Sequence, residues 1–544
     1  MRAAHPRKFV RVTKFLLAGV TLFCVSWIAS VSEWHTGVRW ISRRERSRGL
    51  PTMRTIVAYS EGKQAEMERP TPVVCDTLPA FPDIAHRNCT WPNTNECVWQ
   101  HVAGIEVSVY AAYYDNRTTQ RHLRILATFH GRNFSTENTL YCQTRSLSPY
   151  EDFIEVVAAR PLEIWWHEWD ATSLDVDTPL LLSCPLTEPL SSTSVVSIVT
   201  QPCDDPTNAF LLHPFSDNTT KRNFTVCVKD LKFEKDISHG LIEWIEINKL
   251  LGVDMIDIYI DDVSAEVEKV IKYYRDKGFV RIFNVPIKYK QNSSLWQRRR
   301  DHIITYNDCL YRNIRESQFV IPLDIDEIIL PKKADTLPEL LTRLKKYGWN
   351  SSNDSAIMIR NVFFFDFMQD IEKYKKIKSK NVYDKRDDVR IKHSKNKDVG
   401  IIELFIDKKN NLSNTVIDLY KEVLGGFKVR FGKEVPIPKL ARSIVSSAIM
   451  SPIGYYSKSI MMTEKVLTAF NHYPLASLGK AGVAGWAAPL SEVQLNHYKE
   501  SCNTTVLAEC AKYGRRARLD TSALRLHKRL SYAIVEAIRK INTT

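Results

Sequence analysis

The sequence predicts an α/β fold in which a parallel sheet carries helices on both faces and a smaller β-rich domain precedes it. Three observations lead to this prediction and to that of a membrane helix before the two domains. Strand-like apolar segments and amphipathic helix-like segments alternate from residue 224 to residue 285. Residues 101–210 contain short apolar segments separated by turn-forming residues. An uncharged apolar segment near the N-terminus adds a transmembrane helix before both domains.

The composition is that of a globular protein. The 544 residues are 44% hydrophobic and 25% charged, which excludes a collagen-like or largely disordered chain. The formal net charge is +14, but residues 1–60 contain eleven Lys and Arg against two Glu, and residues 511–544 contain nine against two acidic residues. The body between these two segments is therefore close to neutral, and we expect no nucleic-acid partner.

The N-terminal region has the pattern of a membrane anchor. Eighteen uncharged residues lie between Lys14 and Glu33, close to the roughly 20 that cross a bilayer, and five cations precede them. We expect a cytoplasmic tail at residues 1–14, a transmembrane signal-anchor at 15–34 and a Pro-containing stem at 35–100. A cleaved signal peptide is the alternative, but the apolar run is long for one and no clear cleavage site follows.

Glycosylation sequons and cysteines indicate the orientation of this anchor. All eleven Asn-x-Ser/Thr sequons follow the apolar segment, as do ten of the eleven Cys. Both features are typical of the secretory pathway, so we expect the body of the protein in a lumen. The sequence leaves the pairing of the Cys open. The sequon residues are Asn88, Asn116, Asn133, Asn218, Asn223, Asn292, Asn350, Asn353, Asn411, Asn503 and Asn542.

Residues 101–210 are expected to form the β-rich domain, a small sandwich. Its strand-like segments are residues 105–110, 123–129, 153–158 and 195–199. Three tryptophans, Trp165, Trp166 and Trp169, are a candidate surface for stacking on sugars. Packing inside the protein is the commoner role of such a cluster, and it is the interpretation that we favour.

The α/β domain is expected to span residues 220–510. Gly252 and Gly278 mark the ends of its first two helices. The predicted elements are strand 224–228, helix 240–252, strand 255–260, helix 263–277 and strand 280–285. Ligands of parallel sheets bind at the carboxyl ends of the strands. The polar residues at those ends are Lys229, Asp230, Asp261 and Asp262.

A pair of aspartates forms the sharpest chemical candidate. In Gln318-Phe-Val-Ile-Pro-Leu-Asp-Ile-Asp-Glu-Ile-Ile-Leu-Pro331 an apolar strand is followed directly by Asp324 and Asp326. In extended backbone these two side chains point the same way and can share one Mg²⁺ or Mn²⁺, whose free positions would accept diphosphate oxygens. The bare D-x-D triplet is weak evidence, because about two are expected by chance in a chain of this length. The second triplet, Asp175-Val-Asp177, lies in the β-rich domain and illustrates the chance occurrence.

The chain resembles family 92 glycosyltransferases, the group that contains animal and plant β-1,4-galactosyltransferases. The resemblance extends from Asn223 to about Cys510, and the tyrosine-rich segment 111–115 continues it into the β-rich domain. The order and spacing of the matching stretches are more specific than any one of them. These stretches are residues 227–230, 241–253, 258–262, 307–312, 321–331, 441–444 and 495–499.

The resemblance implies a GT-A fold, which is a Rossmann-like nucleotide-sugar-binding domain. It also implies UDP-galactose as the donor, a manganese ion and inversion at the anomeric carbon. Asp324 and Asp326 match the metal motif of the family, and His497, in Leu495-Asn-His-Tyr-Lys499, matches a late His-Tyr motif that often supplies a third metal ligand. The family motif usually ends in Arg, so Lys499 replaces a bidentate phosphate contact by a point charge. The four polar residues at the strand ends become candidate donor ligands.

An inverting transfer also needs a general base near the acceptor hydroxyl. The sequence offers Asp366, after the apolar run 362–365, and His472, in Asn471-His-Tyr-Pro474. Asp366 would serve equally as a helix or turn cap, and His472 would serve equally as a structural residue. The base is therefore left open between these two and others.

Two further segments flank or interrupt the predicted catalytic domain. Residues 369–409 are rich in Lys, Arg and Asp and lack an apolar period, which predicts a long solvated loop rather than a lid over the acceptor. Residues 511–544 are expected to contain a basic C-terminal helix. Its apolar stripe predicts docking on the parent domain, although a basic face of this kind also suits a membrane surface.

Our hypothesis from the sequence is a type II Golgi membrane galactosyltransferase that acts on a glycan acceptor of a glycoprotein or glycolipid. The alternative is a membrane-anchored glycan-binding protein with an inactive glycosyltransferase fold. A metal-dependent nuclease would use the same carboxylates, but the near-neutral body argues against a phosphate-rich polymer.

Overall fold

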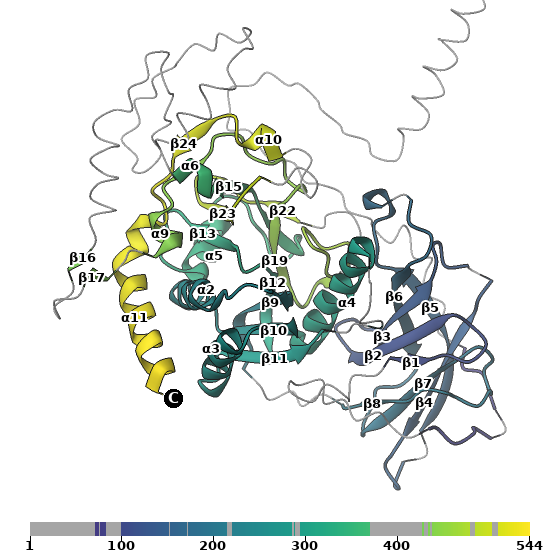
Figure 1. Cartoon of the computed structure of the whole chain (residues 1–544). Coiled ribbons are helices and arrows are strands. Elements are labelled where there is room, and N and C mark those ends of the chain that lie inside the picture. The colour runs from purple at the N-terminus through teal and green to yellow at the C-terminus, as the bar shows by residue number, and fades with distance from the viewer. Residues whose placement is uncertain are drawn as a thin grey trace, which may run out of the picture. The chain divides into compact units, whose positions relative to one another are not determined.

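A computed structural model of the chain is shown in Figure 1. It describes residues 71–82 (without 76), 99–214 (without 136, 152 and 171), 220–285, 288, 294–369, 427–428, 434–435, 438–478, 485–502 and 510–543. By its internal contacts the chain divides into residues 1–53 and 54–544, and every described residue belongs to the second unit. The predicted tail and signal-anchor lie outside the described residues, as does the charged segment after residue 369. Within the described ranges, no helix is both long and apolar enough to span a bilayer.

The β-rich domain follows the sequence prediction closely. Its strands form one hydrogen-bonded order, β1-β2-β3-β6-β5-β4-β7-β8. The strands are β1 (Gln100–His101), β2 (Val107–Asp115), β3 (Arg121–His130), β4 (Leu140–Ser146), β5 (Ile154–Glu163), β6 (Asp177–Leu186), β7 (Ser194–Val199) and β8 (Phe210–Leu212), and the 3-10 helix η1 (His167–Trp169) follows β5.

Strand β5 joins the two halves of this β-rich domain. Residues 154–159 pair with β4, whereas residues 160–163 pair with β6. The two halves enclose one apolar core, to which Val109 of β2, Val157 of β5 and Ile198 of β7 contribute. The continuous sheet is thus folded onto itself around its own core, as a sandwich requires.

The second part of the protein is built on a seven-stranded sheet of order β11-β10-β9-β12-β19-β14-β22. Strands β11, β10, β9 and β12 are mutually parallel, whereas β19 is antiparallel to both of its neighbours. The elements up to β12 are β9 (Arg222–Lys232), α2 (Ser238–Leu250), β10 (Met255–Asp262), α3 (Ala265–Asp276), β11 (Val280–Asn284), α4 (Leu295–Asn313) and β12 (Ser317–Pro322). The parallel strand–helix alternation predicted from the apolar periods is confirmed.

Helices cover both faces of this sheet. Alternate residues of β9, such as Phe224 and Val226, pack with α2 and α3, while the next residue, Cys227, points to the opposite face and packs with α4. In Figure 1 helix α4 lies between the sheet and the β-rich domain, and residues of β3 and β6 share its apolar cluster. As predicted, helix α2 ends before Gly252, which has a φ of +86° that suits glycine.

The remaining described elements follow the acidic motif. A second, three-stranded sheet has the order β13-β23-β15. The elements in chain order are β13 (Glu327–Pro331), α5 (Leu337–Lys345), β14 (Ala356–Ile359), β15 (Asn361–Phe365), α6 (Asp366–Gln369), β16 (Phe427–Lys428), β17 (Glu434–Val435), α9 (Lys439–Arg442), β18 (Val445–Ser447), β19 (Lys458–Met462), β20 (Val466–Thr468), β21 (Ala476–Ser477), β22 (Trp486–Ala487), β23 (Val493–Lys499), α10 (Cys510–Tyr513), β24 (Ala517–Leu519), η2 (Leu524–Leu526) and α11 (His527–Thr543).

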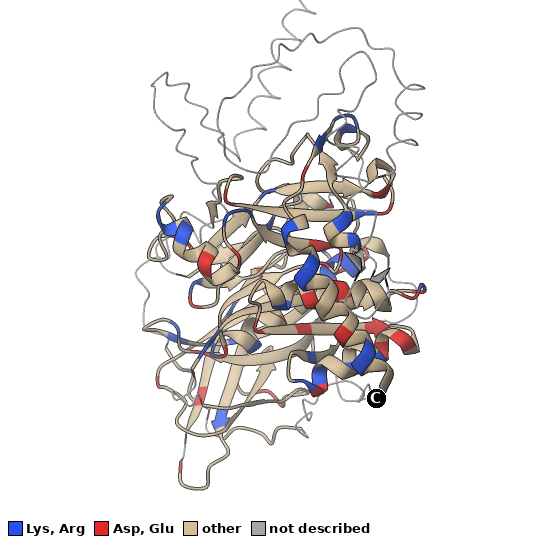
Figure 2. Cartoon of the chain, turned by 90° about the vertical axis from the view of Figure 1, so that its left-hand side faces the viewer, with Lys and Arg blue, Asp and Glu red and all other residues tan. Residues whose placement is uncertain are grey.

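The C-terminal helix α11 docks on the α/β part, as its apolar stripe predicts. Leu530 and Ile541 are buried in the cluster that contains α2 and α3, and Ile534 and Ile538 pack against it. Strand β24, which precedes the helix, pairs with β18. Basic and acidic residues are interspersed over the described elements in the view of Figure 2, in keeping with a near-neutral body.

Eight cysteines form four disulfides in the described structure. They are Cys75–Cys203, Cys142–Cys184, Cys227–Cys309 and Cys502–Cys510. The Cys227–Cys309 bond ties β9, an inner strand of the parallel set, to α4. This bond therefore fixes the two elements that carry much of the site described below.

Six of the eleven sequon residues fall in the described ranges. Asn116 is half-buried, whereas the other five are exposed: Asn133, Asn223, Asn350, Asn353 and Asn542. Asn88, Asn218, Asn292, Asn411 and Asn503 lie outside the described residues.

Candidate active site

The candidate active site lies where the parallel strands end. Strand β12 pairs with β9, and β9 with β10, all in parallel. Asp324 follows β12, Lys229 and Asp230 lie near the end of β9, and Asp261 lies at the end of β10. The topology thus gathers at one edge the polar residues that the sequence analysis selected.

The acidic motif is a turn and not the extended segment that we expected. The N–H of Glu327 donates to the carbonyl of Asp324 at 3.0 Å, which closes a four-residue turn with Asp326 inside it. The prediction that extended backbone points Asp324 and Asp326 the same way is therefore wrong. Each carboxylate instead meets its own set of cationic partners.

Asp324 lies between two lysines. Nζ of Lys229 is 2.9 Å from its Oδ1, and Nζ of Lys458 is 3.3 Å from its Oδ2. Burial raises the pKa of Asp324, but the two ammonium groups outweigh it and hold the pKa well below its ordinary value. Asp324 is therefore charged and neutralised by the chain's own residues.

Asp326 is paired with two groups of β23. Nζ of Lys499 lies 2.8 Å from its Oδ2, and Nε2 of His497 lies 3.4 Å from the same oxygen. Burial raises the pKa of Asp326, but His497 and Lys499 together lower it below its ordinary value. The late His-Tyr motif is thus brought to the acidic turn by the pairing of β23 with β13, in which His497 is opposite Glu327.

Glu327 completes the centre of the site. Its side chain is only 3% exposed, with Oε2 3.4 Å from Nζ of Lys458 and Oε1 3.3 Å from Nδ1 of His497. Burial raises the pKa of Glu327, opposed by Lys458. Oε2 also accepts from the backbone N–H of Asp324 at 3.2 Å. Glu327 therefore touches the partners of both aspartates.

A polar chain leads from Lys458 to His472. Nζ of Lys458 donates to Oδ1 of Asn471 at 2.8 Å, and Asn471 Nδ2 lies 3.3 Å from Nε2 of His472. Nδ1 of His472 is 2.8 Å from the carbonyl of Ser457. Burial and Lys458 lower the pKa of His472 to about 3. Both ring nitrogens are engaged and the ring resists protonation, which makes His472 a poor proton acceptor.

The end of β9 faces helix α4. Nε of Arg298 donates to Asp230 at 2.7 Å, and Nε2 of His302 lies 3.0 Å from the same carboxylate. Burial raises the pKa of Asp230, but His302, Lys229 and Arg298 hold it far below its ordinary value.

The end of β10 is tied to the same group. Asp261 is 3.1 Å from Nζ of Lys232 and 3.7 Å from Arg298. Asp262 is exposed. Asp261 is thus joined to Asp230 through Arg298.

Asp366 is paired with a lysine outside the acidic turn. It is the first residue of α6 and forms an ion pair of 2.8 Å with Lys439. Its side chain is 38% exposed. Asp366 thus stands at a helix start, the alternative that the sequence offered to a role as general base.

The donor set suits a divalent cation that is shared with a ligand. Among the described residues, no three His, Cys, Asp or Glu side chains converge on one point closely enough to hold an ion alone. Nε2 of His497 is nevertheless buried, makes no hydrogen bond of normal geometry and faces a carboxylate oxygen of Asp326. One imidazole and one carboxylate fit Mn²⁺ or Mg²⁺ whose other positions are filled by substrate phosphates and water.

The tryptophan cluster packs where the β-rich domain meets the α/β part. Trp165 is buried, and the Arg300 guanidinium lies 4.3 Å from the centre of its ring. Trp169 is half-buried and lies 5.0 Å from Phe470 and 5.6 Å from His472 between ring centres. The packing interpretation holds for Trp165. Because Trp169 contacts His472, the β-rich domain reaches the rim of the site.

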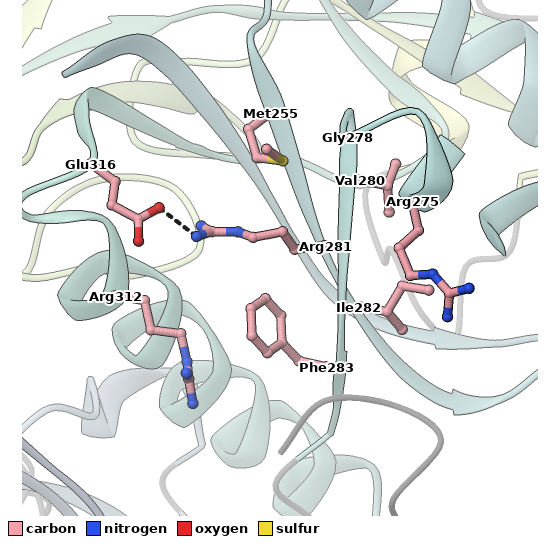
Figure 3. Close-up of a pocket in the computed structure, with 9 residues that line it drawn as sticks. All are labelled: Met255, Arg275, Gly278, Val280, Arg281, Ile282, Phe283, Arg312 and Glu316. Atoms are coloured by element: carbon pink, nitrogen blue, oxygen red, sulfur yellow. Dashed lines mark hydrogen bonds and ion pairs between the residues drawn. The ribbon is translucent and has the colours of Figure 1, made fainter. Parts of the chain in front are cut away.

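A separate pocket of about 590 Å³ lies at the opposite end of the parallel strands. Met255 and Val280, which line it, are the first residues of β10 and β11. Figure 3 shows that Arg281 points toward Glu316 in this pocket. Arg281 also pairs with Asp257 through two 2.7 Å hydrogen bonds, so its charge is satisfied within the protein. This pocket is distinct from the acidic turn.

A comparison with known protein families decides where the chain belongs. The sequence profile of Glycosyltransferase family 92 matches residues 222–531, more than half of the chain. The chain belongs to glycosyltransferase family 92. The matched region contains the acidic turn, its three lysines, His497 and β24, and it ends inside α11.

Two curated relatives from Caenorhabditis elegans are similar to parts of this family 92 chain. "Beta-1,4-galactosyltransferase galt-1" is 27% identical over 123 residues, which are 22% of this chain and 28% of the relative. "Glycosyltransferase family 92 protein F13G3.3" is 23% identical over 194 residues, 34% of this chain and 36% of the relative. The matched stretches thus span about a third of each relative's length.

Several site residues were not selected from the sequence. In the sequence, Glu327 stands out only as part of the acidic motif, and Lys458, Asn471 and His302 have no signal of their own. Lys458 opens the short strand β19, whose position beside β12 no local pattern indicates. The sequence feature that could have selected Glu327 is its position as a third carboxylate at the start of an apolar strand.

Proposed function

We propose that this family 92 protein is a metal-dependent, inverting glycosyltransferase of the GT-A type. It transfers galactose from UDP-galactose to a glycan acceptor on a glycoprotein or glycolipid. The observation that supports this most strongly is the acidic turn 324–327 at the carboxyl ends of parallel strands, with Lys229, Lys458 and Lys499 around it. Family membership and the name of the galactosyltransferase relative support the reaction class and the sugar.

The transfer forms one bond and breaks one. An acceptor hydroxyl oxygen attacks the anomeric carbon of galactose, the bond from that carbon to the diphosphate oxygen breaks, and UDP leaves with the bonding electrons. The hydroxyl proton passes to a general base. Because attack and departure are on opposite faces, the anomeric configuration inverts. The protein must therefore hold the acceptor opposite the diphosphate.

The charges of the site suit the departing diphosphate. A bound Mn²⁺ or Mg²⁺ would supply a Lewis acid that stabilises its developing negative charge. Asp326 and His497 would hold that ion. Lys499 would then be free to turn from Asp326 to a phosphate oxygen, because a bound cation would neutralise that carboxylate. Lys229 could also contact a phosphate, because Lys458 would still neutralise Asp324. Asp230 and Asp261, both in contact with Arg298, would bind polar groups of the nucleotide.

The acceptor would enter from the side of Trp169. This side chain comes from the β-rich domain, is half-buried and contacts His472. His472 connects through Asn471 to Lys458 and hence to the acidic turn. An aromatic edge beside a polar site suits the apolar face of a sugar ring. His472 would support the Trp169 ring at this edge rather than accept the acceptor's proton.

We further propose that the protein is a single-pass type II membrane protein whose catalytic body is in the Golgi lumen. The apolar segment 15–34, the sequons that follow it and the four disulfides of the body support this location. Tagging both ends and testing protease protection in intact vesicles would check the topology. A protected C-terminus with an accessible N-terminus is the expected result.

The function is tested by a donor-by-acceptor screen with the full-length protein in detergent. UDP-galactose, UDP-glucose and UDP-N-acetylglucosamine are each offered with Mn²⁺ and a panel of glycans. We expect product only with UDP-galactose, and loss of product with EDTA. If neither transfer nor UDP release occurs with any pair, the enzyme proposal fails. Glycan binding without turnover would support the alternative of an inactive, glycan-binding glycosyltransferase fold.

A further inference from the structure

Glu327 has two buried basic neighbours, one on each carboxylate oxygen. Oε1 is 3.3 Å from Nδ1 of His497, and Oε2 is 3.4 Å from Nζ of Lys458. The three side chains are 3%, 9% and 1% exposed. Burying a charged carboxylate costs desolvation free energy. The contacts of both oxygens with basic groups must compensate for that cost if the carboxylate is to stay charged in the folded protein.

The contact with Glu327 bears on which ring nitrogen of His497 carries the proton. Imidazole presents a lone pair at one nitrogen when the other carries hydrogen. A carboxylate at Nδ1 favours hydrogen there, which leaves the lone pair of Nε2 directed toward Asp326. The amide nitrogen of Asn361, a donor, lies 3.1 Å from Nδ1, and its amide oxygen is buried without a hydrogen-bond partner. The two ends of an amide are assigned from such contacts, and the unpaired oxygen favours the reverse assignment. Turned by 180°, that amide would place its oxygen at Nδ1–H as well.

We propose that Glu327 is the positioning residue of the metal site. It fixes His497 with Nε2 free to bind the ion and, through Lys458, it fixes Asp324 beside it. This inference rests on the proposed function, in which Asp326 and His497 hold the ion. Carboxylates behind metal-bound histidines orient the ring in this way. Glu327 is not itself a ligand in this account, because both of its oxygens face other groups.

Glu327→Gln is the sharpest substitution, because Gln has nearly the same shape but only one oxygen. If that oxygen accepts from Nδ1–H of His497, the amide NH₂ faces the ammonium of Lys458. If the amide turns, NH₂ faces His497 and favours the wrong tautomer. Either arrangement disrupts one of the two contacts without removing side-chain volume.

The readout is Mn²⁺ binding, not activity. The full-length protein with UDP is titrated with Mn²⁺, and free Mn²⁺ is followed by its electron paramagnetic resonance signal. Echo modulation from a coordinated ¹⁴N nucleus reports whether a histidine is bound. We expect wild type to show this modulation and Glu327→Gln to weaken Mn²⁺ binding by roughly 10- to 100-fold with loss of the modulation.

A matched control is Glu492→Gln. Glu492 is a fully buried carboxylate beside the start of β23, the strand of His497, but it pairs with Arg343 and Tyr347 away from the acidic turn. The Glu492→Gln substitution should leave Mn²⁺ affinity and the ¹⁴N signal unchanged even if it lowers stability. Unchanged Mn²⁺ binding and ¹⁴N signal in Glu327→Gln would overturn the inference. Absence of Mn²⁺ binding in wild type would instead refute the metal-dependent function.

Discussion

Lys458 and Asp324 contact each other although 134 residues separate them in the sequence: Nζ lies 3.3 Å from Oδ2. Lys458 opens β19, and Asp324 follows β12, its antiparallel neighbour. The strand pairing therefore places a buried cation at the acidic turn. This cation also contacts Glu327, so one lysine neutralises two carboxylates of the same turn.

Replacing Lys458 with methionine should lower stability strongly. The change leaves Glu327 buried without its cation and Asp324 with Lys229 alone, and we expect the free energy of unfolding in urea to fall by about 3 kcal/mol. Lys235→Met is the control, because Lys235 and Glu500 form an ion pair in which both side chains are 69% exposed. Its loss should change stability by less than about 1 kcal/mol. Equal effects of the two substitutions would contradict a structural role for Lys458.

Asp301, on the face of α4 toward the β-rich domain, should make stability depend on pH. Burial, with Asp177 nearby, raises its pKa to about 7, whereas an unfolded chain has a pKa of about 3.9. Between these values the unfolded chain has released a proton that the folded chain keeps, so stability falls as pH rises from about 4 to 7. Asn cannot ionise and can keep the hydrogen bond from Gln297.

The Asp301→Asn variant should therefore gain stability over wild type as pH increases. We expect equal stability at pH 4 and an advantage of at least about 1 kcal/mol at pH 8. Urea unfolding across this range measures it. A difference between variant and wild type that is the same at every pH would show that Asp301 ionises normally in the folded protein.

Replacing Trp169 with alanine should weaken acceptor binding. If Trp169 forms the aromatic edge of the acceptor side, the KM for the acceptor should rise about 3- to 10-fold while the KM for the donor changes little. Tyr150→Ala, which removes a 97% exposed aromatic of the same domain, is the control. An equal rise in both KM values for Trp169→Ala would indicate a general packing defect instead.

The α/β core could be predicted because its elements have strong local periods. Residues 224–228, 255–260 and 280–285 are short apolar runs with turn or helix signals between them, and each became a parallel strand. Parallel pairing then places their carboxyl ends together, so Lys229 and Asp230 can be selected as site residues from the sequence alone.

The rest of the site depends on contacts that no local pattern contains. Strand β12 ends at Pro322, so Asp324 and Asp326 lie in a turn and not in the extended backbone that side-chain alternation requires. Lys458 reaches the turn through an antiparallel strand of five residues. His497 reaches it through a separate three-stranded sheet, and only family resemblance had selected it.

The central claim is that Asp326 belongs to a catalytic metal site, and UDP release from UDP-galactose with Mn²⁺ tests it most directly. Asp326→Ala is compared with Asp175→Ala, an aspartate of the second D-x-D triplet that is fully exposed. We predict turnover in wild type and Asp175→Ala and a loss of at least about 100-fold in Asp326→Ala, the scale expected when electrostatic stabilisation of a leaving group is removed. Turnover that is unchanged in Asp326→Ala would contradict the account.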